Sequence, residues 1–251
     1  MTPGGPTDAD RLRLREAPRE RPVMRQVWRD LGFLHWPIAR AAVAARLPPG
    51  LEVDTFDGIA YLGLVPFTIP LTRTPRLGLP IAPAFHEVNL RTYVHRGGRD
   101  PGVWFFSLDA ASRLAVAGAR AAYHLPYFHA RLSLETLDGP RFVYRARRRG
   151  AGPPAELSVR YGPIGPVAPA APGSLEFFLT ERYLLYAWDG HALSTARVHH
   201  APYPLAPAVA SDVRETLARA AGLSPTAGPP PVVHHAREVD VRIYRPHRAE
   251  R

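Results

Sequence analysis

Cysteine and lysine are both absent from this chain, and all 32 of its Lys and Arg positions are arginine. Without cysteine there is no disulfide, no thiol nucleophile and no thiolate metal site. Without lysine there is no side-chain amine that could form a Schiff base with a carbonyl substrate. Several classes of covalent catalysis are therefore excluded before any motif is considered.

Long apolar runs are absent as well. No window of the sequence approaches the roughly 20 apolar residues that a membrane-spanning helix needs. Residues 1–22 are rich in proline, glycine and arginine and lack the apolar segment of a secretory signal, so we expect a flexible leader there. We expect residues 23–251 to form a single domain, and the protein to be cytoplasmic.

Positive charge predominates, with 22 acidic residues against the arginines and a net charge of +10. Such an excess favours anionic partners, which include nucleic acid, a membrane surface and acidic small molecules. The arginines form no stripe and are not interleaved with aromatic residues, which argues against nucleic acid and membrane partners. Partner recognition through a local arginine cluster is a further alternative, and that cluster consists of Arg145, Arg147, Arg148 and Arg149.

Many short segments alternate apolar and polar residues at the period of β-strands, and few segments show a helical pattern. We expect a proline-rich loop over residues 70–84, of the kind that often covers a site. This pattern predicts an α+β fold built around a curved or closed antiparallel sheet. The expected helices cover residues 38–47, 110–124, 174–183 and 211–221, and the expected strands cover 24–34, 51–56, 59–69, 86–95, 102–109, 128–137, 141–149, 155–161 and 232–244.

The strand expected from His86 carries an unusual set of polar side chains. Alternate side chains of a strand share a face, so an acid, an amide, a guanidinium and a phenol lie together at Glu87, Asn89, Arg91 and Tyr93. At about 3.3 Å per residue, Glu87 and Arg91 are roughly 13 Å apart, which is far enough to bracket a ligand without neutralising each other. The alternative is an ordinary strand whose polar face lies in water.

The neighbouring strand, residues 102–109, is too apolar to have one face in water, which indicates that both of its faces are covered. Ser107 and Asp109 share a face near its end. A carboxylate that emerges from such a strand either caps the following helix or serves as an acid in a pocket.

Taken as a set, motifs spread over roughly residues 24–245 resemble the YqjF-like family of domains of unknown function. The motifs are Trp28-Arg29-Asp30-Leu31, His35-Trp36-Pro37, Leu51-Glu52-Val53-Asp54, Phe56-Asp57-Gly58, Glu87-Val88-Asn89-Leu90-Arg91-Thr92-Tyr93-Val94, residues 102–109, Leu125-Pro126-Tyr127 and Leu179-Thr180-Glu181-Arg182-Tyr183. The resemblance extends to the acetoacetate decarboxylase-like superfamily. It implies a cone-shaped, mostly antiparallel β-barrel with a few outer helices and a ligand cavity, into which the polar face of the Glu87 strand would look.

The decarboxylases of that superfamily carry a Gly-Arg-Glu…Pro-Lys-Lys stretch, in which a lysine forms the Schiff base. In the similar stretch of this chain Arg120 and Pro126 match, whereas Tyr127 and Phe128 stand where the lysines would be. Because the chain contains no lysine, no other strand can supply the amine. The resemblance therefore implies the pocket without the imine chemistry.

The same resemblance implies roles for individual side chains. Burial inside a barrel should raise the pKa of Glu87, which could then act as a general acid or base near neutral pH. Arg91 and Asn89 could hold a substrate carboxylate or an enolate oxygen, and Tyr127, Tyr93 and His129 are candidate proton donors. We expect Glu87, Arg91 and Tyr127 to be catalytic, and the expected substrate-binding residues are Asn89, Tyr93, Ser107, Asp109, Arg120, His129 and His35.

Neither a metal nor a cofactor is expected. His199-His200 and His234-His235 are adjacent pairs whose side chains point to opposite faces of a strand, and no His-Glu-x-x-His spacing occurs. The motifs of hydrolase elbows, P-loops and dinucleotide-binding folds are also missing.

A small-molecule ligand is the expected partner, and two functions remain open. The first is a lysine-independent lyase or isomerase that performs acid-base chemistry on a small oxo-acid or carbonyl compound. The second is a non-catalytic protein that binds an anionic or apolar metabolite. Assembly into a homo-oligomer is compatible with either function, although no apolar stripe identifies a surface for it.

Overall fold

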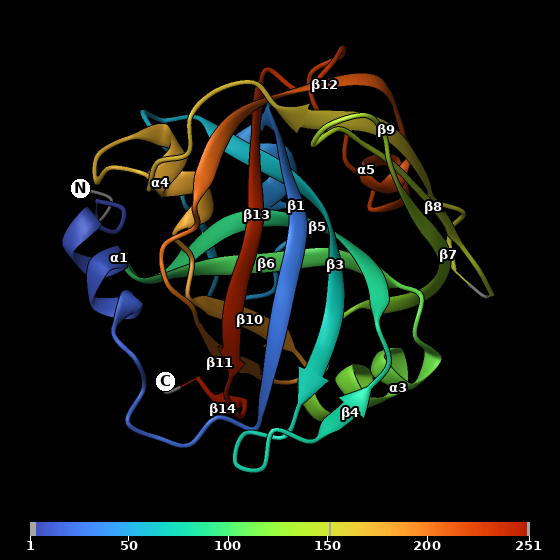
Figure 1. The fold of residues 1–251 in the computed structure, drawn as a ribbon. Coiled ribbons are helices and arrows are strands. Elements are labelled where there is room, and N and C mark those ends of the chain that lie inside the picture. Colours follow the sequence, from blue (N-terminus) through green and yellow to red (C-terminus); the bar gives the residue numbers. More distant parts are fainter. Residues whose placement is uncertain (1–3, 151, 250–251) are drawn as a thin grey trace.

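The computed structural model describes residues 4–150 and 152–249, and most of the elements in it are β-strands (Figure 1). All of these strands belong to one continuous sheet. The strands are β1 (Met24–Ile38), β2 (Glu52–Val53), β3 (Ala60–Arg73), β4 (Pro80–Ala82), β5 (Phe85–Arg96), β6 (Arg99–Ala110), β7 (Tyr127–Thr136), β8 (Phe142–Arg148), β9 (Glu156–Pro163), β10 (Leu184–Trp188), β11 (Leu193–His199), β12 (Leu205–Glu215), β13 (Val232–Ile243) and β14 (His247–Arg248).

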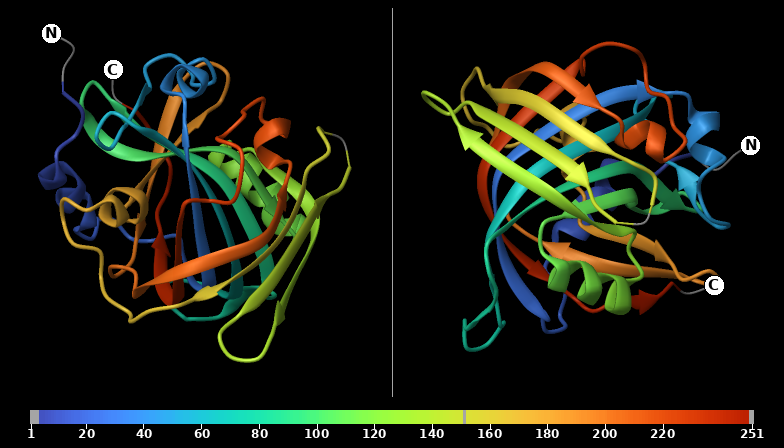
Figure 2. Two further views of the ribbon diagram at one scale, coloured as in Figure 1. Left: turned by 90° about the horizontal axis from the view of Figure 1, so that it is seen from above. Right: turned by 90° about the vertical axis from the view of Figure 1, so that its right-hand side faces the viewer.

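The sheet closes on itself in two rings that share strands, and its curvature is visible in Figure 2. The first ring runs β1, β3, β5, β6, β10, β11 and β13, and the pairing of β11 with β13 closes it. The second ring leaves β6 through β7, β8, β9 and β12 and returns to β13. Most neighbours are antiparallel, and β6 pairs in parallel with β10 and β7. The expected α+β, cone-shaped and mostly antiparallel barrel is thereby confirmed.

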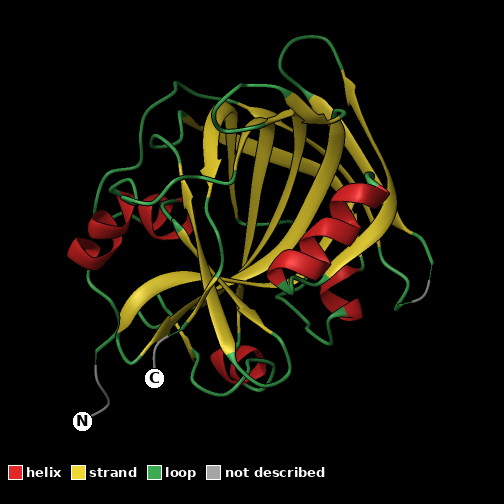
Figure 3. Cartoon of the chain, turned by 90° about the horizontal axis from the view of Figure 1, so that it is seen from below, coloured by secondary structure: helices red, strands yellow, loops and turns green. Residues whose placement is uncertain are grey.

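The helices are few and short, and they lie around the outside of the strands (Figure 3). Side chains of Thr7, Ser112 and Ser174 cap three of them by accepting hydrogen bonds from the first-turn backbone. The helices are α1 (Asp8–Arg15), α2 (Arg40–Ala44), α3 (Arg113–Tyr123), α4 (Leu175–Thr180) and α5 (Leu217–Ala220).

The shared strands are buried on both faces because each ring encloses its own apolar core. On β5, Phe85 and Tyr93 pack into the core of the first ring, whereas Val88 and Leu90 pack into the core of the second ring. A strand in this position has no wet face, so any polar side chain on it must find its partners inside the protein.

Two expected helices are shorter in the structure than the sequence predicts. Residues up to Ile38 continue β1, where Pro37 pairs with Tyr61 of β3, and only Arg40–Ala44 are helical. Likewise β12 continues through Ser211 to Glu215 against β9, and α5 begins only at Leu217. In both cases the hydrogen bonds of a sheet already in place outweigh a local helix signal.

The expected proline-rich loop and flexible leader also differ from the structure. Within residues 70–84, β3 extends to Arg73 and pairs with the short strand β4. In the leader, residues 8–15 form α1, whose Arg11 is buried against Asp54. A buried ion pair orders a segment that composition alone classified as mobile. Residues 1–3 of that leader lie outside the described residues.

Candidate functional site

The polar face of β5 points into the first ring. Glu87 lies opposite Phe67 of β3 and Ala110 of β6, which both belong to the core of that ring. Asn89 and Arg91 follow on the same face and end at Tyr93 in the same core. Each of these four polar side chains is buried, and Glu87 is only 4% exposed. The alternative of a polar strand face in water does not apply to this strand.

Glu87 and Tyr127 form a hydrogen-bonded pair. The Tyr127 hydroxyl donates to Glu87 Oε2 at 3.0 Å. Burial raises the pKa of Glu87 to about 8; the Tyr127 hydrogen bond lowers it, and the charge of Asp109 raises it. Burial, followed by the charge of Glu87, raises the pKa of Tyr127 well above its ordinary value. Both groups therefore hold their protons at neutral pH, and Glu87 is the one that can exchange its proton near that pH.

Backbone contacts fix the position of this pair. Tyr144, on β8 in the second ring, donates its hydroxyl to the carbonyl oxygen of Glu87 at 2.7 Å. Arg120 at the end of α3 donates from Nε to the carbonyl oxygen of Tyr127 at 2.7 Å. The Arg120 side chain is exposed and acts on the main chain, so the structure gives it a supporting position and not the expected contact with substrate.

Asp109 and Ser107 lie on the other face of the sheet from Glu87. In the β5–β6 register Asp109 is opposite Val88 and Ser107 is opposite Leu90, and both partners belong to the second ring. Arg148 binds Asp109 through two hydrogen bonds of 2.7 and 2.9 Å. The expected role of Asp109 as a helix cap is wrong, because Ser112 caps α3. Both oxygens of its carboxylate bind Arg148, and its role as a pocket acid stays a prediction.

The aromatic ring of Phe128 supports this ion pair. The Arg148 guanidinium lies 3.7 Å from the centre of the Phe128 ring. Tyr127 and Phe128 therefore serve the two carboxylates differently, since the phenol binds the protonated Glu87 and the benzyl ring stacks on the cation that neutralises Asp109. His129 lies half-buried on the same face of β7 as Tyr127.

The Arg91 end of the polar face is tied to the last turn of α4. Arg91 donates to the carbonyl oxygen of Leu179 at 3.1 Å, and the Tyr93 hydroxyl donates to the same oxygen at 2.7 Å. His35 Nε2 lies 2.7 Å from the Tyr93 hydroxyl. The expected residues His35, Arg91 and Tyr93 are therefore brought together in one buried group.

His200 and Tyr203 complete this group, and sequence reasoning did not select either. Their rings lie 4.4 Å apart, and the charge of Arg91 influences the pKa of both residues. Burial lowers the pKa of His200 to about 4, so its imidazole is neutral at physiological pH. The adjacent His199-His200 pair was the only available signal, and it could not show which of the two histidines faces the core.

The Thr180-Glu181-Arg182-Tyr183 motif anchors the outer helices. Arg182 and Arg11 both bind Asp54 Oδ2 at 2.7 Å, and Arg15 binds Glu181 at 2.9 Å. These contacts hold α1 and α4 against the end of the first ring at which Tyr93 lies, because Arg182 stacks on the Tyr93 ring at 4.9 Å.

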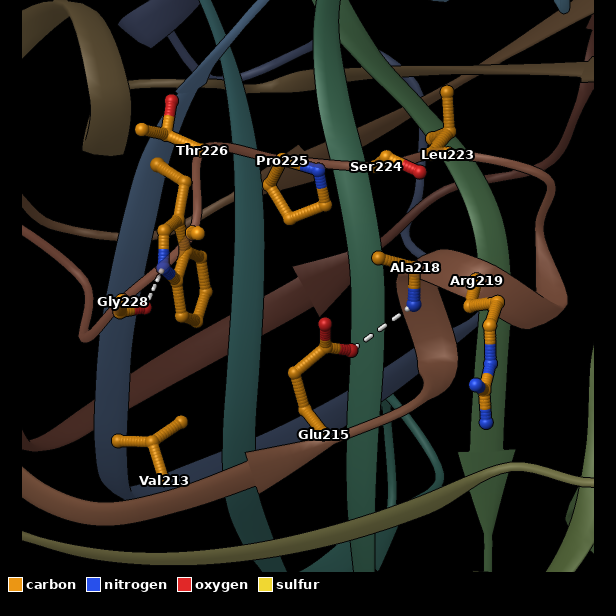
Figure 4. Close-up of a pocket in the computed structure, with 11 residues that line it drawn as sticks. Val213, Glu215, Ala218, Arg219, Leu223, Ser224, Pro225, Thr226 and Gly228 are labelled. Atoms are coloured by element: carbon orange, nitrogen blue, oxygen red, sulfur yellow. Dashed lines mark hydrogen bonds between the residues drawn. The ribbon is translucent and has the colours of Figure 1, made fainter.

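A surface pocket of about 300 Å³ lies elsewhere, beside α5 (Figure 4). Trp36 and Glu215 line it, but each already has an internal partner. Trp36 Nε1 donates to Gly228 at 3.1 Å, and Glu215 accepts from the Ala218 backbone at 3.0 Å. The pocket lacks the clustered buried polar groups of the first ring, and the first ring is therefore the stronger candidate site.

Solved structures show that this protein has an acetoacetate decarboxylase-like fold. The enduracididine biosynthesis enzyme MppR, in complex with pyruvate, matches with a TM-score of 0.62 at 14% identity over 93% of each chain. The acetoacetate decarboxylase of Legionella pneumophila subsp. pneumophila str. Philadelphia 1 matches with a TM-score of 0.62 at 14% identity over 93% of this chain and 92% of that one. At such identities the likeness shows the fold alone.

Sequence comparison is more specific. Residues 25–240 match the DUF2071 family, described as an uncharacterized conserved protein, and the chain belongs to that family. It is 40% identical over 223 residues to the uncharacterized protein YqjF of Bacillus subtilis (strain 168), an alignment that covers 88% of this chain and 90% of that protein. The resemblance drawn from the sequence motifs is thereby confirmed.

Proposed function

We propose that this protein is a Schiff-base-independent acid-base enzyme of the lyase or isomerase type that acts on a small oxo-acid or carbonyl compound. The observation that carries the proposal is the hydrogen bond between buried Glu87 and partly buried Tyr127, in which the pKa of the carboxyl is about 8. A carboxyl with this proton affinity can both release and accept a proton near neutral pH.

The pair fits proton transfer at a carbon next to a carbonyl group. Ionised Glu87 would take the proton as the C–H bond breaks, and the electron pair of that bond would move to the carbonyl oxygen. As Glu87 takes up the proton and no longer needs a donor, the Tyr127 hydroxyl would turn its one hydrogen from Glu87 to the resulting enolate oxygen. Return of the proton from Glu87 to another carbon completes an isomerisation, whereas loss of a neighbouring leaving group completes an elimination.

Relatives of the same fold support the substrate class without defining it. One such protein is a biosynthesis enzyme seen with pyruvate, and others are acetoacetate decarboxylases. In this chain Tyr127 stands where those decarboxylases would place a lysine, and no lysine occurs at any position. The proposed chemistry therefore proceeds without an imine, and the remaining proposed substrate contacts are Arg91, Asn89 and His129.

Hydrogen–deuterium exchange tests the proposal without knowledge of the natural substrate. In D₂O, NMR would follow exchange of the C3 hydrogens of 2-oxohexanoate in the presence of the protein. Glu87→Gln should slow the catalysed exchange by about 100-fold or more, because it removes the proton acceptor. Glu135→Gln makes the same chemical change at an exposed carboxylate and should leave the rate unchanged. Equal rates for wild type and Glu87→Gln would refute the acid-base proposal.

A non-catalytic binding protein is the second candidate. It is favoured by the contacts at the Arg91 end, where Leu179 already occupies one guanidinium nitrogen of Arg91 and the hydroxyl of Tyr93. Under this alternative 2-oxohexanoate binds but does not exchange its hydrogens faster than it does in buffer.

The remaining partner expectations are also proposals. Among the described helices, none is long and apolar enough to cross a membrane. Within the arginine cluster, Arg145, Arg147 and Arg148 each bind an acidic side chain, which supports the expectation that nucleic acid is not a partner. We retain a cytoplasmic location and the option of a homo-oligomer as expectations.

A further inference from the structure

The hydrogen-bond network determines which nitrogen of His35 carries the proton. The Tyr93 hydroxyl has one hydrogen, and it donates that hydrogen to the Leu179 carbonyl at 2.7 Å. His35 Nε2, at 2.7 Å from the Tyr93 oxygen, must therefore be the donor of that contact. Burial lowers the pKa of His35 well below its ordinary value, so the ring is neutral and Nδ1 is a bare acceptor.

The same reasoning applies to His200. Its Nδ1 lies 2.8 Å from the carbonyl oxygen of Ala201, and a carbonyl oxygen only accepts. His200 Nδ1 therefore carries the proton, and Nε2 is left as a bare acceptor. The side chain is 2% exposed, and Nε2 has no hydrogen-bond partner among the residues that the structure describes.

Two further side chains in the first ring also have a buried polar atom without a hydrogen-bond partner among the described residues. Asn89 Oδ1, an acceptor, and Arg91 Nε, a donor, are buried without a hydrogen-bond partner in the described part of the chain, and so is His35 Nδ1. Arg91 lies among these groups. Its guanidinium is 5.7 Å from the centre of the Tyr93 ring, whose hydroxyl contacts His35. It is 5.6 Å from the Phe33 ring, which packs on Tyr203 beside His200. Asn89 precedes Arg91 by two residues on the same strand face.

The four unpaired groups around Arg91 thus comprise three acceptors and one cationic donor, and, within residues 4–150 and 152–249, Arg182 Nη2 and Glu181 Oε1 are also unpaired nearer to α4. Buried polar groups normally bind a complementary partner, and an acceptor nitrogen or oxygen requires a hydrogen donor. A carboxylate or a bare carbonyl could satisfy Arg91, but it would offer nothing to His35, His200 or Asn89. A hydroxyl group both donates and accepts, and it therefore fits this arrangement.

We propose that the ligand of the first ring is a polyhydroxylated acid or carbonyl compound of the sugar-acid type, whose hydroxyl groups donate to His200 Nε2, His35 Nδ1 and Asn89 Oδ1 while an anionic oxygen accepts from Arg91 Nε. This inference rests on the proposed function, since it takes the same interior as the ligand site. The Glu87–Tyr127 pair would face the other end of such a chain, because four residues of β5 separate Glu87 from Arg91, which is roughly 13 Å.

Two probes of equal charge and equal carbon number test this ligand class. Gluconate carries hydroxyl groups along its six-carbon chain, and hexanoate carries none. By calorimetry, gluconate should bind at least about 10-fold more tightly than hexanoate, the effect of one or more additional buried hydrogen bonds. Equal binding, tighter binding of hexanoate or no binding of either probe would overturn the proposal.

Amino-acid substitutions test which residues cause the preference for gluconate over hexanoate. His200→Phe keeps an aromatic ring but removes the acceptor, and Asn89→Leu removes the second acceptor at similar size, so each should reduce the preference for gluconate by about 10-fold. Arg145→Gln, at an exposed site on β8, is the control and should keep the full preference. A preference that survives in folded His200→Phe and Asn89→Leu proteins would contradict the assignment.

Failure of this inference and failure of the proposed function are distinguishable. If gluconate is not preferred but the Glu87-dependent deuterium exchange is intact, only the proposal of a sugar-acid ligand is refuted. If gluconate is clearly preferred but no exchange is catalysed, the sugar-acid ligand proposal is supported and the proposed enzymatic function is refuted.

Discussion

The hydroxyl of Tyr127 donates a hydrogen bond of 3.0 Å to the carboxyl of Glu87, at the position where the resemblance to the decarboxylases would put a lysine. A lysine there would bring a positive charge that ionises the glutamate. A phenol brings no charge, and burial therefore keeps the proton on Glu87 to about pH 8. Under the proposed function, this replacement would suit the site to proton transfer and not to imine formation.

The raised pKa of Glu87 makes stability depend on pH. The carboxyl keeps its proton up to about pH 8 in the folded protein but releases it near its ordinary value of 4.5 in the unfolded chain. Between these values the unfolded state binds fewer protons, so stability should fall as pH rises, by up to about 5 kcal/mol in total. Glu87→Gln should remove this loss. In thermal unfolding measured from pH 5 to pH 9, the stability of the variant relative to the wild type should therefore increase with pH. A constant difference across that range would contradict the raised pKa.

Removal of the Tyr127 hydroxyl should raise the pKa of Glu87 further, because the hydrogen bond from Tyr127 favours the ionised carboxylate. We expect Tyr127→Phe to move the titration of Glu87, followed by NMR of a ¹³C-labelled carboxyl, to higher pH. The catalysed deuterium exchange of 2-oxohexanoate should also slow in this variant. Tyr61→Phe is a suitable control, because Tyr61 also belongs to the first-ring core and is not a hydrogen-bond partner of Glu87. A titration shifted to lower pH would contradict the assignment of the hydrogen bond.

The ion pair of Asp109 and Arg148 should be important for stability, because both side chains are less than 5% exposed. Arg148→Met would leave a buried carboxylate without its cation, at a cost of about 3–5 kcal/mol in the free energy of unfolding. Arg145→Met, on the same strand, removes an exposed partner of Glu135 and should cost less than about 1 kcal/mol. Urea unfolding measures both variants, and similar costs would show that the Asp109 pair is not effectively buried.

Asp54 is shared by two buried arginines, Arg11 and Arg182, which predicts an asymmetric response to mutation. Arg11→Met leaves Asp54 paired with Arg182 and should cost about 1 kcal/mol or less. Asp54→Asn leaves two cations facing each other without a carboxylate and should cost about 3 kcal/mol or more. A larger loss in urea unfolding for Arg11→Met than for Asp54→Asn would contradict this account of how α1 is attached.

Expectations based on strand periodicity agree well with the structure. The alternation at Glu87, Asn89, Arg91 and Tyr93 placed these side chains on one face because the period of a strand does not depend on its surroundings. The strand from Val232 follows from an equally local signal. The helix expected at residues 38–47 is present but shorter, covering Arg40–Ala44. In the helix expected at residues 211–221, the first half is strand because pairing with β9 outweighed local preference.

The orientation of β6 against β5 could not be predicted in this way. Leu90 pairs with Ser107 and Arg91 pairs with Phe105, so Phe106 is an additional residue that shifts the register. This irregularity places Ser107 and Asp109 behind the sheet and not beside Glu87. The alternation of residues within β6 does not predict which face of β6 lies on the same side of the sheet as Glu87.

The amino-acid sequence alone determined the absence of imine chemistry, the β-rich fold class and the set of polar residues on β5, because these depend on residue identity and on the short period of a strand. Only the tertiary structure decided that Tyr127 meets Glu87, that Arg148 neutralises Asp109 and that His200 joins Arg91. These contacts connect residues that are far apart in the chain, and closure of the sheet into rings brings them together. The burial that raises the pKa of Glu87 has the same origin, since only a closed sheet excludes water from both faces of β5.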